Sequence, residues 1–346
     1  MKKYKGKILV TGCAGFIGHF TCIRLLNLGY RVVGIDNLNN YYSVKLKKHR
    51  LRRISNFSNQ INNFSFEKID LSNYSKLKKL FKKYNFDYIV NLAAQAGVQY
   101  SLINPKSYIN SNIIGFFHIL ELSNEFKIKH LITASTSGVY GANTSVPFKE
   151  TDMTDHQIQL YAATKKSNEL MAHSYSYLFK IPITVLRFFT VYGPWGRPDM
   201  SLYKFVKNII NNKKIFLNNF GNHSRSFTYI DDVVDVVAKL IKIIPKRQFT
   251  NSSLVAPFEI YNVGNNKKIT LKNFLKIIEK NLKLKAKINL RELQLGDIVE
   301  TEADISKIKK IVKYFPKISL EDGVRKFVDW YKIYHNANKN FKKKYK

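Results

Sequence analysis

Cysteine is nearly absent from this chain, which has only Cys13 and Cys22 among 346 residues. Two cysteines nine positions apart provide neither a disulfide framework nor the paired spacing of a metal site. No apolar run approaches the roughly 18 residues that a membrane span needs. The chain start, residues 1–7, is basic and leads straight into an apolar strand, unlike a signal peptide. We therefore expect a cytoplasmic protein that holds no metal and does not enter a membrane.

Acidic residues are also scarce, since 24 Asp and Glu face 58 Lys and Arg and leave a net charge of +34. One interpretation is binding to nucleic acid or to a membrane surface. The other is a compositional bias, because lysines are spread over most of the expected helices and no basic cluster coincides with a nucleic-acid motif. We favour the bias and expect no nucleic-acid partner. The positive field would still attract a small anionic ligand.

The first motif is a glycine-rich turn. An apolar strand from Lys7 runs into Gly12, Gly15 and Gly18 and then into an amphipathic helix that extends to Leu28. Glycines here permit a tight turn and allow the backbone to approach a pyrophosphate at a helix N-terminus. The spacing is GxxGxxG, so the strand–turn–helix context carries more weight than the motif itself.

A second strand, 30–35, ends in Asp36. A carboxylate at this place can accept both hydroxyls of a ribose and would repel a 2′-phosphate, which favours NAD over NADP. The alternative is an aspartate that only caps a turn.

Strands and helices alternate through the first half, which predicts a doubly wound parallel sheet of the Rossmann type. Ligands of such sheets bind at the carboxyl ends of the strands. The second half is less regular and predicts a smaller mixed α/β lobe that binds the substrate. We expect helices over 105–126, 161–179, 231–244 and 319–335 and a polar loop over 246–257. The predicted division is a first domain at 1–188, to which the chain returns around 226–262, a second lobe at 189–225 and 263–336, and a basic tail at 337–346.

The chemistry is concentrated in Thr136, Tyr161 and Lys165. Tyr161 and Lys165 are four residues apart in a predicted helix, so both side chains lie on one face. An ammonium beside a phenol favours the phenolate, which makes Tyr161 a candidate general base with Lys165 as its activator. Thr136, at the end of a strand, could complete a proton relay. A lone YxxxK is weak evidence, and its weight comes from the glycine motif before it.

These motifs together resemble the extended short-chain dehydrogenase/reductase superfamily. The longer runs are similar to UDP-glucuronate 4-epimerases over about residues 7–330, and they are AAQAG at 93–97, LYAATKK at 160–166, ELMAHS at 169–174 and RFFTVYGPWGRPDM at 187–200. The resemblance implies an enzyme that converts UDP-glucuronate to UDP-galacturonate through a 4-keto intermediate, with tightly held NAD and catalysis by Thr136, Tyr161 and Lys165. It also implies a homodimer formed through the helices at 105–126 and 157–179.

The resemblance assigns a cofactor site and a substrate site. Asp70 is implied beside the adenine, although it could equally cap the helix expected at 73–84. The implied cofactor contacts are Gly12, Gly15, Phe16, Ile17, Gly18, Asp36, Asn37, Asp70, Leu71, Leu92, Ala93, Ala94, Asn112, Ala134, Tyr161 and Lys165. The implied substrate contacts are Ser135, Ser137, Thr190, Arg197, Arg225, Gln294 and Asp297.

The prediction that the sugar has a carboxylate depends mainly on Arg197. Pro194 and Pro198 stiffen its loop, and a guanidinium suits a planar carboxylate, so we expect Arg197 and Thr190 to bind a carboxylate at C6 of the sugar. The alternatives are that Arg197 pairs with Asp199 or caps the next helix. Arg225 could likewise be a surface ion-pair residue.

The sequence differs from the family's usual pattern at some positions, and alternative functions have to be weighed. Gln99 and Ser226 stand where the family commonly has arginine and aspartate, and either change could alter the pocket. A 4,6-dehydratase would need Asp-Glu after Thr136, where this chain has Ser137 and Gly138. Asp36 disfavours a reductase that uses free NADPH. A 4-epimerase of UDP-N-acetylglucosamine or UDP-glucose stays open, as does a non-enzymatic NAD-binding regulator, although such a regulator usually lacks the Tyr or the Lys.

Overall fold

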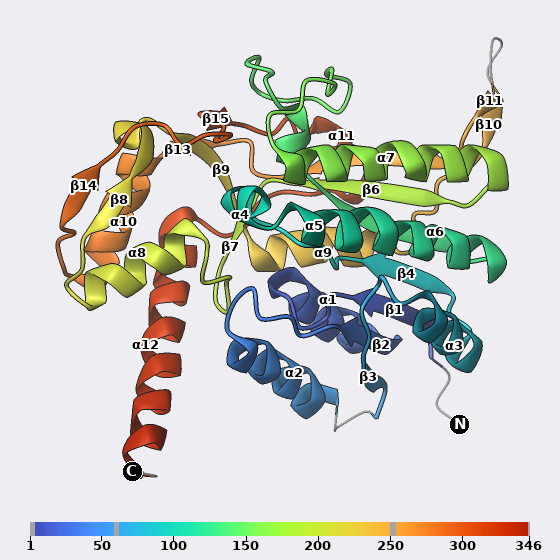
Figure 1. The fold of residues 1–346 in the computed structure, drawn as a ribbon, viewed down its shortest axis with the longest axis horizontal. Helices are drawn as coiled ribbons and strands as arrows, with labels where there is room; N and C mark the ends of the chain where they lie inside the picture. Colours follow the sequence, from blue (N-terminus) through green and yellow to red (C-terminus); the bar gives the residue numbers. More distant parts are fainter. Residues whose placement is uncertain (1–3, 59–61, 250–253, 345–346) are drawn as a thin grey trace.

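The computed structural model describes residues 4–58, 62–249 and 254–344. Its centre is a parallel sheet of seven strands in the order β12-β6-β5-β4-β1-β2-β3 (Figure 1). This is the predicted Rossmann-type sheet. Its strands are β1 Lys7–Thr11, β2 Arg31–Asp36, β3 Phe64–Lys68, β4 Tyr88–Asn91, β5 His130–Thr136, β6 Ile183–Phe188 and β12 Phe258–Val263.

Helices cover both faces of this sheet, because its strands are apolar on both sides. Side chains alternate along β1, so Ile8 and Val10 pack in one core with α1 and α9, while Leu9 packs in the other with α3 and α6. The helices are α1 Phe16–Asn27, α2 Val44–Ser58, α3 Tyr74–Tyr84, α4 Val98–Ile103, α5 Pro105–Tyr108, α6 Gly115–Glu125, α7 Leu160–Phe179, α8 Ser201–Ile210, α9 Ile230–Leu240, α10 Leu271–Leu282, α11 Ser306–Val312 and α12 Leu320–Lys344.

The direction of winding reverses between β1 and β4, which are neighbours in the sheet but not in the chain. The loops after these two strands leave the sheet in opposite directions and open a crevice between them. The glycine-rich turn follows β1, and residues 92–94 follow β4. The fold thus brings two of the predicted cofactor segments to one place.

A smaller sheet is built around β9 Ser224–Tyr229, which pairs with three short strands. Further short strands complete the described set: β7 Thr190–Tyr192, β8 Ile215–Leu217, β10 Gln248–Phe249, β11 Leu254–Val255, β13 Lys268–Thr270, β14 Ile288–Leu290 and β15 Glu300–Thr301. β12 lies beside β6 in the large sheet, whereas β9 belongs to the small one. The division into two lobes along the predicted boundaries remains a prediction.

Three predicted elements differ from the structure. The helix expected over 105–126 contains a π-helical turn at Ile109–Ile114. The predicted polar loop at 246–257 carries the β10–β11 hairpin, although residues 250–253 are outside the described part. The last helix does not stop at 335 before a tail but runs on to Lys344, since its sequence has no proline or glycine there to end it.

Within the described segments, no helix is both long enough and apolar enough to cross a membrane. The same segments contain no group of three His, Cys, Asp or Glu side chains that could hold a metal ion.

Candidate active site

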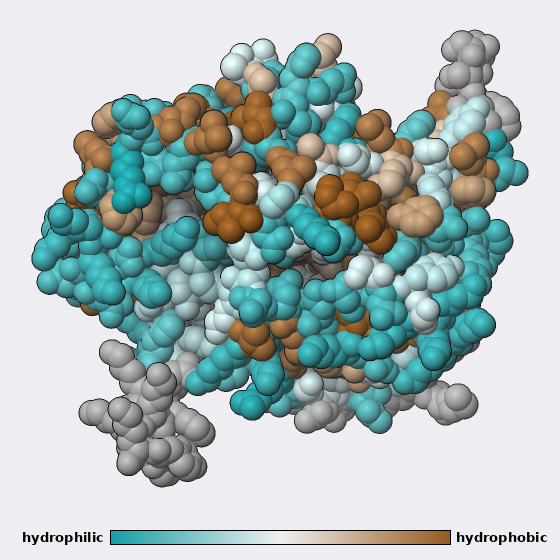
Figure 2. Space-filling model, viewed as in Figure 1, coloured by the Kyte–Doolittle hydropathy of each residue, from teal (hydrophilic) through white to brown (hydrophobic). Residues whose placement is uncertain are grey.

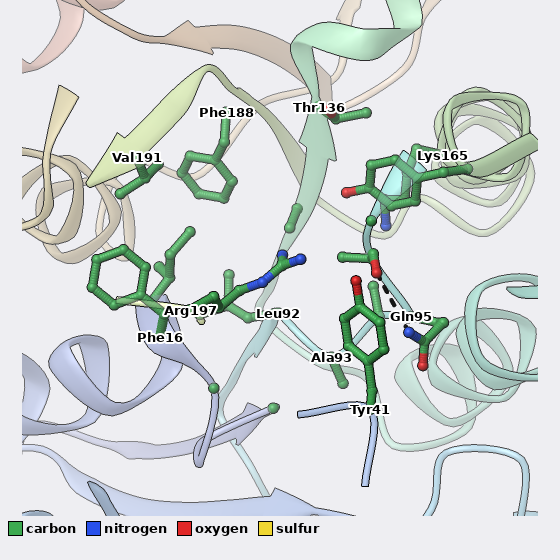
Figure 3. Close-up of a pocket in the computed structure, with 18 of the residues that line it drawn as sticks. Phe16, Tyr41, Leu92, Ala93, Gln95, Thr136, Lys165, Phe188, Val191 and Arg197 are labelled. Carbon is green, nitrogen blue, oxygen red and sulfur yellow. Dashed lines mark hydrogen bonds between the residues drawn. The ribbon is translucent and has the colours of Figure 1, made fainter. Parts of the chain in front are cut away.

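A cavity of about 480 Å³ lies at the carboxyl ends of the large-sheet strands and is also lined by Arg225 of β9 (Figure 3). Almost all of the predicted site residues line it. The lining includes the predicted residues Gly12, Gly15, Phe16, Ile17, Gly18, Asp36, Asn37, Asp70, Leu71, Leu92, Ala93, Ala94, Ala134, Ser135, Thr136, Ser137, Tyr161, Lys165, Thr190, Arg197, Arg225 and Asp297. Asn112 and Gln294 are not among the lining residues.

The glycine-rich turn forms a cradle that only glycine allows. Gly12 has a φ of +67°, and a Cβ on it would lie 2.9 Å from the Ala93 backbone. A Cβ on Gly18 would lie 2.1 Å from the carbonyl oxygen of Gly12. The turn thus packs tightly on its own backbone and on Ala93 and sets the N-terminus of α1 at the cavity, which fits the pyrophosphate of a dinucleotide.

Asp36 lies at the end of β2 beside this cradle. One carboxylate oxygen accepts a hydrogen bond from the Ala14 amide at 3.2 Å and the other accepts from the Leu38 amide at 2.8 Å. Burial raises the pKa of Asp36, while the nearby Lys47 opposes the rise. Lys47, which belongs to none of the sequence motifs, also lines the cavity. Asp36 thus both caps its turn and faces the predicted ribose position.

Asp70 was weighed as the N-cap of α3, and that alternative is wrong. The N-cap is Asn73, whose side chain accepts from the Lys76 amide at 3.0 Å. Asp70 instead accepts hydrogen bonds from the side chains of Asn37 and Ser72, both at 2.7 Å. These bonds lower the pKa of Asp70 against the effect of its partial burial and fix the carboxylate at the cavity wall.

Tyr161 and Lys165 both reach the cavity from α7, and Thr136 reaches it from the end of β5. Burial raises the pKa of Tyr161, and the charge of Arg197 and a hydrogen bond with Thr136 oppose that rise. Burial lowers the pKa of Lys165 to about 8. The charge of Arg197, which also lines the cavity, thus favours the phenolate form of Tyr161, and the activation of Tyr161 by Lys165 stays a prediction.

A chain of hydrogen bonds fixes Lys165. Its ammonium donates to the Asn168 side chain at 3.0 Å, and Asn168 donates to the Asn112 carbonyl oxygen at 2.7 Å. The Asn112 amide group in turn bonds the backbone of Gln95 and the hydroxyl of Thr164. Asn112 lies in the π-helical turn, a feature often found at functional sites. It was predicted as a cofactor contact, but its side chain is buried behind the cavity and holds two segments of the wall together.

Ser135 has its hydroxyl turned to a buried ion pair. It donates to Glu169 at 2.6 Å, and Glu169 pairs with Arg187 at 2.9 Å, with both side chains at most 3% exposed. Ser137, two residues later, lines the cavity.

Arg197 points into the middle of the cavity, and the Tyr41 hydroxyl points into the same space (Figure 3). Arg197 forms a two-point ion pair with Asp199, in which the Nε–Oδ1 distance is 3.0 Å. Tyr41 donates to the same carboxylate at 3.1 Å. The alternative that Arg197 pairs with Asp199 is thus what the chain alone shows, and binding of a sugar carboxylate by Arg197 stays a prediction. The Asn39–Tyr42 segment was missed, since nothing local in it signals contact with residue 199.

Arg225 is also paired. It bonds Asp297 at 3.2 Å and the Val299 carbonyl oxygen at 2.9 Å, and His223 lies 3.3 Å from the same carboxylate. His223 and Arg225 lower the pKa of Asp297 against its burial. Gln294 was predicted, like Asp297, as a substrate contact. Its backbone carbonyl oxygen accepts a hydrogen bond from the Asp297 amide at 3.0 Å. Arg225 and Asp297 line the same cavity as the glycine cradle.

Comparison with known proteins places this site in a family. The family model described as GDP-mannose 4,6 dehydratase matches residues 9–327. Protein CapI of Staphylococcus aureus is 49% identical over 95% of this chain and 99% of its own length. A probable UDP-glucuronate 4-epimerase of Rhizobium meliloti (strain 1021) is 42% identical over 94% of this chain and 96% of its own. The crystal structure of UDP-glucuronic acid 4-epimerase from Bacillus cereus with UDP-glucuronic acid and NAD is 33% identical, covers 94% of this chain and 99% of that one, and has a TM-score of 0.84. The predicted resemblance is thereby confirmed, and the chain belongs to the UDP-glucuronate 4-epimerase family of the extended short-chain dehydrogenases/reductases.

Proposed function

We propose that this protein is an NAD-dependent 4-epimerase that interconverts UDP-glucuronate and UDP-galacturonate. The observation that carries the proposal is one cavity that joins a glycine cradle, a carboxylate at the end of β2, and the Thr136–Tyr161–Lys165 set. The names of the relatives in Rhizobium meliloti and Bacillus cereus support the same reaction.

The residues of the chain define the proton path. Tyr161 as phenolate takes the proton of the C4 hydroxyl, and Thr136 hydrogen-bonds the same oxygen. The glycine cradle, Asp36 and Lys165 would hold NAD, which when bound supplies the hydride acceptor and donor. Tyr161 returns the proton after the 4-keto sugar has turned about its pyrophosphate link. C4 is then inverted without net oxidation or reduction.

The matched family model is described as a dehydratase, but the residues after Thr136 do not support dehydration in this chain. Elimination of water across C5 and C6 needs a further acid and base. Those positions are Ser137 and Gly138, neither of which has a carboxylate. We therefore propose epimerisation.

The substrate proposed here carries a carboxylate at C6, bound by Arg197 with Thr190. Arg197 is 22% exposed and Asp199 23%, so their pair faces the cavity and is open to competition by another carboxylate. Two-point binding to a planar carboxylate is the geometry that a guanidinium favours.

A panel of UDP-sugars tests the function. Purified protein is incubated separately with UDP-glucuronate, UDP-glucose and UDP-N-acetylglucosamine, and the C4 epimers are resolved by NMR. We expect UDP-glucuronate to be preferred over UDP-glucose in kcat/KM by on the order of 10²-fold or more. Equal rates would refute the carboxylate assignment and leave only the 4-epimerase class, and no epimer from any sugar would refute the enzyme proposal.

We also propose a homodimer. Large apolar side chains are exposed on the predicted interface helices, including Ile109, Phe117, Leu170 and Leu178, of which Leu170 is 60% exposed. Brown patches lie over this part of the surface (Figure 2). Leu170→Glu should give a monomer in light scattering, whereas Leu284→Glu, at an exposed position of the second lobe, should not. A monomeric wild type would contradict the dimer.

The proposed setting is the cytoplasm, with the product used in polysaccharide synthesis. Cell fractionation with an assay of 4-epimerase activity checks the first point. Loss of a galacturonate-containing glycan on deletion of the gene checks the second.

A further inference from the structure

A second hollow of about 390 Å³ lies outside the candidate active site, between α2 and α12, and we call it the tryptophan groove. Its basic residues are His49, Arg52 and Arg53, and its aromatic residues are Trp195, Trp330 and Tyr334. None of these residues lines the large cavity. α12 descends beside α2 (Figure 1), and the two helices are joined by a hydrogen bond of 2.9 Å between His49 and Tyr334.

The aromatic residues of the groove pack closely on one another, with Trp195 tilted against Trp330 and edge-on to Tyr334. The ring centroids of Trp195 lie 5.4 Å from Trp330 and 5.3 Å from Tyr334, and Trp330 is stacked on Tyr334. Trp195 has a φ of 62°, which is unusual for a bulky residue. Strained backbone of this kind persists where surrounding contacts fix it. Here Arg50 donates hydrogen bonds to the carbonyl oxygens of Trp195 and Gly196, so the indole is held in its place at the groove.

The groove is also cationic. Arg52 is exposed, and the guanidinium of Arg53 lies 5.8 Å from the Trp195 ring centroid and 3.1 Å from the His19 side chain. Among the described residues, no ion pair joins Arg52 or Arg53 to a carboxylate within 4.0 Å, and Asp231 acts on Arg53 only at longer range. Aromatic rings beside two arginines that have no such carboxylate partner among the described residues suit a planar ring that carries phosphate.

We propose that the tryptophan groove binds a nucleoside diphosphate, with the base against Trp195 and Trp330 and the diphosphate on Arg52 and Arg53. The site stands apart from the proposed function, because none of its residues belongs to the candidate active site. Its wall nevertheless contains Trp195, two positions before Arg197. Arg50 links the same segment to the glycine turn by a bond of 3.0 Å to the Ala14 carbonyl oxygen. A ligand in the groove therefore touches the loop that presents Arg197.

The chain provides its own reporter for this site, since Trp195 and Trp330 are its two tryptophans. UDP is titrated into the purified full-length protein while tryptophan fluorescence is followed, with uridine and inorganic pyrophosphate titrated separately. We expect saturable quenching by UDP and weaker binding of uridine, which has a base but no phosphate. Arg52→Ala should weaken UDP quenching by about tenfold or more, as expected for loss of a charge-assisted contact.

Lys48→Ala is the matched control, because Lys48 is exposed on the same helix but does not line the groove. It should leave the titration unchanged, and equal melting temperatures show that both variants are folded. Equilibrium dialysis at a fixed UDP concentration then compares bound UDP per chain. The Arg52→Glu variant should bind fewer UDP molecules per chain than the wild type, with a difference of at most one. Any UDP that the variant still binds is attributed to the active site. Quenching that is absent, equal for uridine and UDP, or unchanged in both Arg52 variants would overturn the proposal.

Discussion

Because Arg197 and Asp199 form an ion pair, we expect substitutions of the two residues to change the preference for the acid substrate in opposite directions. In the chain alone, Asp199 occupies the Nε and Nη2 edge of Arg197, and Tyr41 holds Asp199 by a further bond of 3.1 Å. A substrate carboxylate must therefore compete with Asp199 for the guanidinium. Asp199→Asn keeps the size of the side chain and removes the competing charge. We expect this variant to bind UDP-glucuronate more tightly and to discriminate more strongly against UDP-glucose.

The magnitude follows from the contacts. A hydrogen bond to a charged group contributes about 1.5–3 kcal/mol, and partial exposure of this pair favours the lower value, which corresponds to a factor of about ten. Arg197→Met should lower the preference for the acid substrate by at least the same factor, and the double variant should behave like Arg197→Met, because Asp199 acts through Arg197.

The assay is kcat/KM for UDP-glucuronate and UDP-glucose in the four proteins, with epimers resolved by NMR. Tyr41→Phe is an intermediate control, since it removes one restraint on Asp199 but no charge. If Asp199→Asn loses the acid preference as fully as Arg197→Met does, Asp199 aims the guanidinium and does not compete for it. If Arg197→Met keeps the preference, the carboxylate is bound elsewhere.

Three further outcomes are expected. Tyr161→Phe should lower turnover by a factor on the order of 10² or more while NAD still copurifies, and near-normal turnover would remove Tyr161 from the mechanism. Asp36→Ala should narrow the gap between NAD and NADP binding in apo-protein, since Lys47 remains beside the emptied position; a wild-type preference for NADP would contradict the role of Asp36. Because burial raises the pKa of Tyr161 and the phenolate is the active form, kcat should rise with pH between about 6 and 10. Arg197→Met removes a cation that opposes the raised pKa, so the rising limb of the pH profile should move to higher pH, and an unmoved limb would show that Arg197 does not act on the base.

The sequence determined the features that depend on local periodicity. Strands β1 to β4 of the large sheet are each followed by a helical pattern, so a parallel sheet with a ligand site at the carboxyl ends of its strands follows from connection rules. Tyr161 and Lys165 share a face because α7 is helical, whatever packs on it. The glycines at 12, 15 and 18 belong to the same class, since the turn they form is completed within a few residues.

Only the tertiary structure decided which charges meet. Asp199 and Tyr41 are 158 positions apart in the chain, and Asp297 lies 72 positions from Arg225, so no local pattern could pair them. The tertiary structure also decided whether a side chain faces the active-site cavity or packs away from it. The resemblance implies that Asn112 contacts the cofactor, yet its side chain bonds Gln95 and Thr164 and is not among the residues that line the cavity. Local sequence sets the backbone course, whereas the partner of a long polar side chain is set by whichever distant segment packs within about 3 Å of its end.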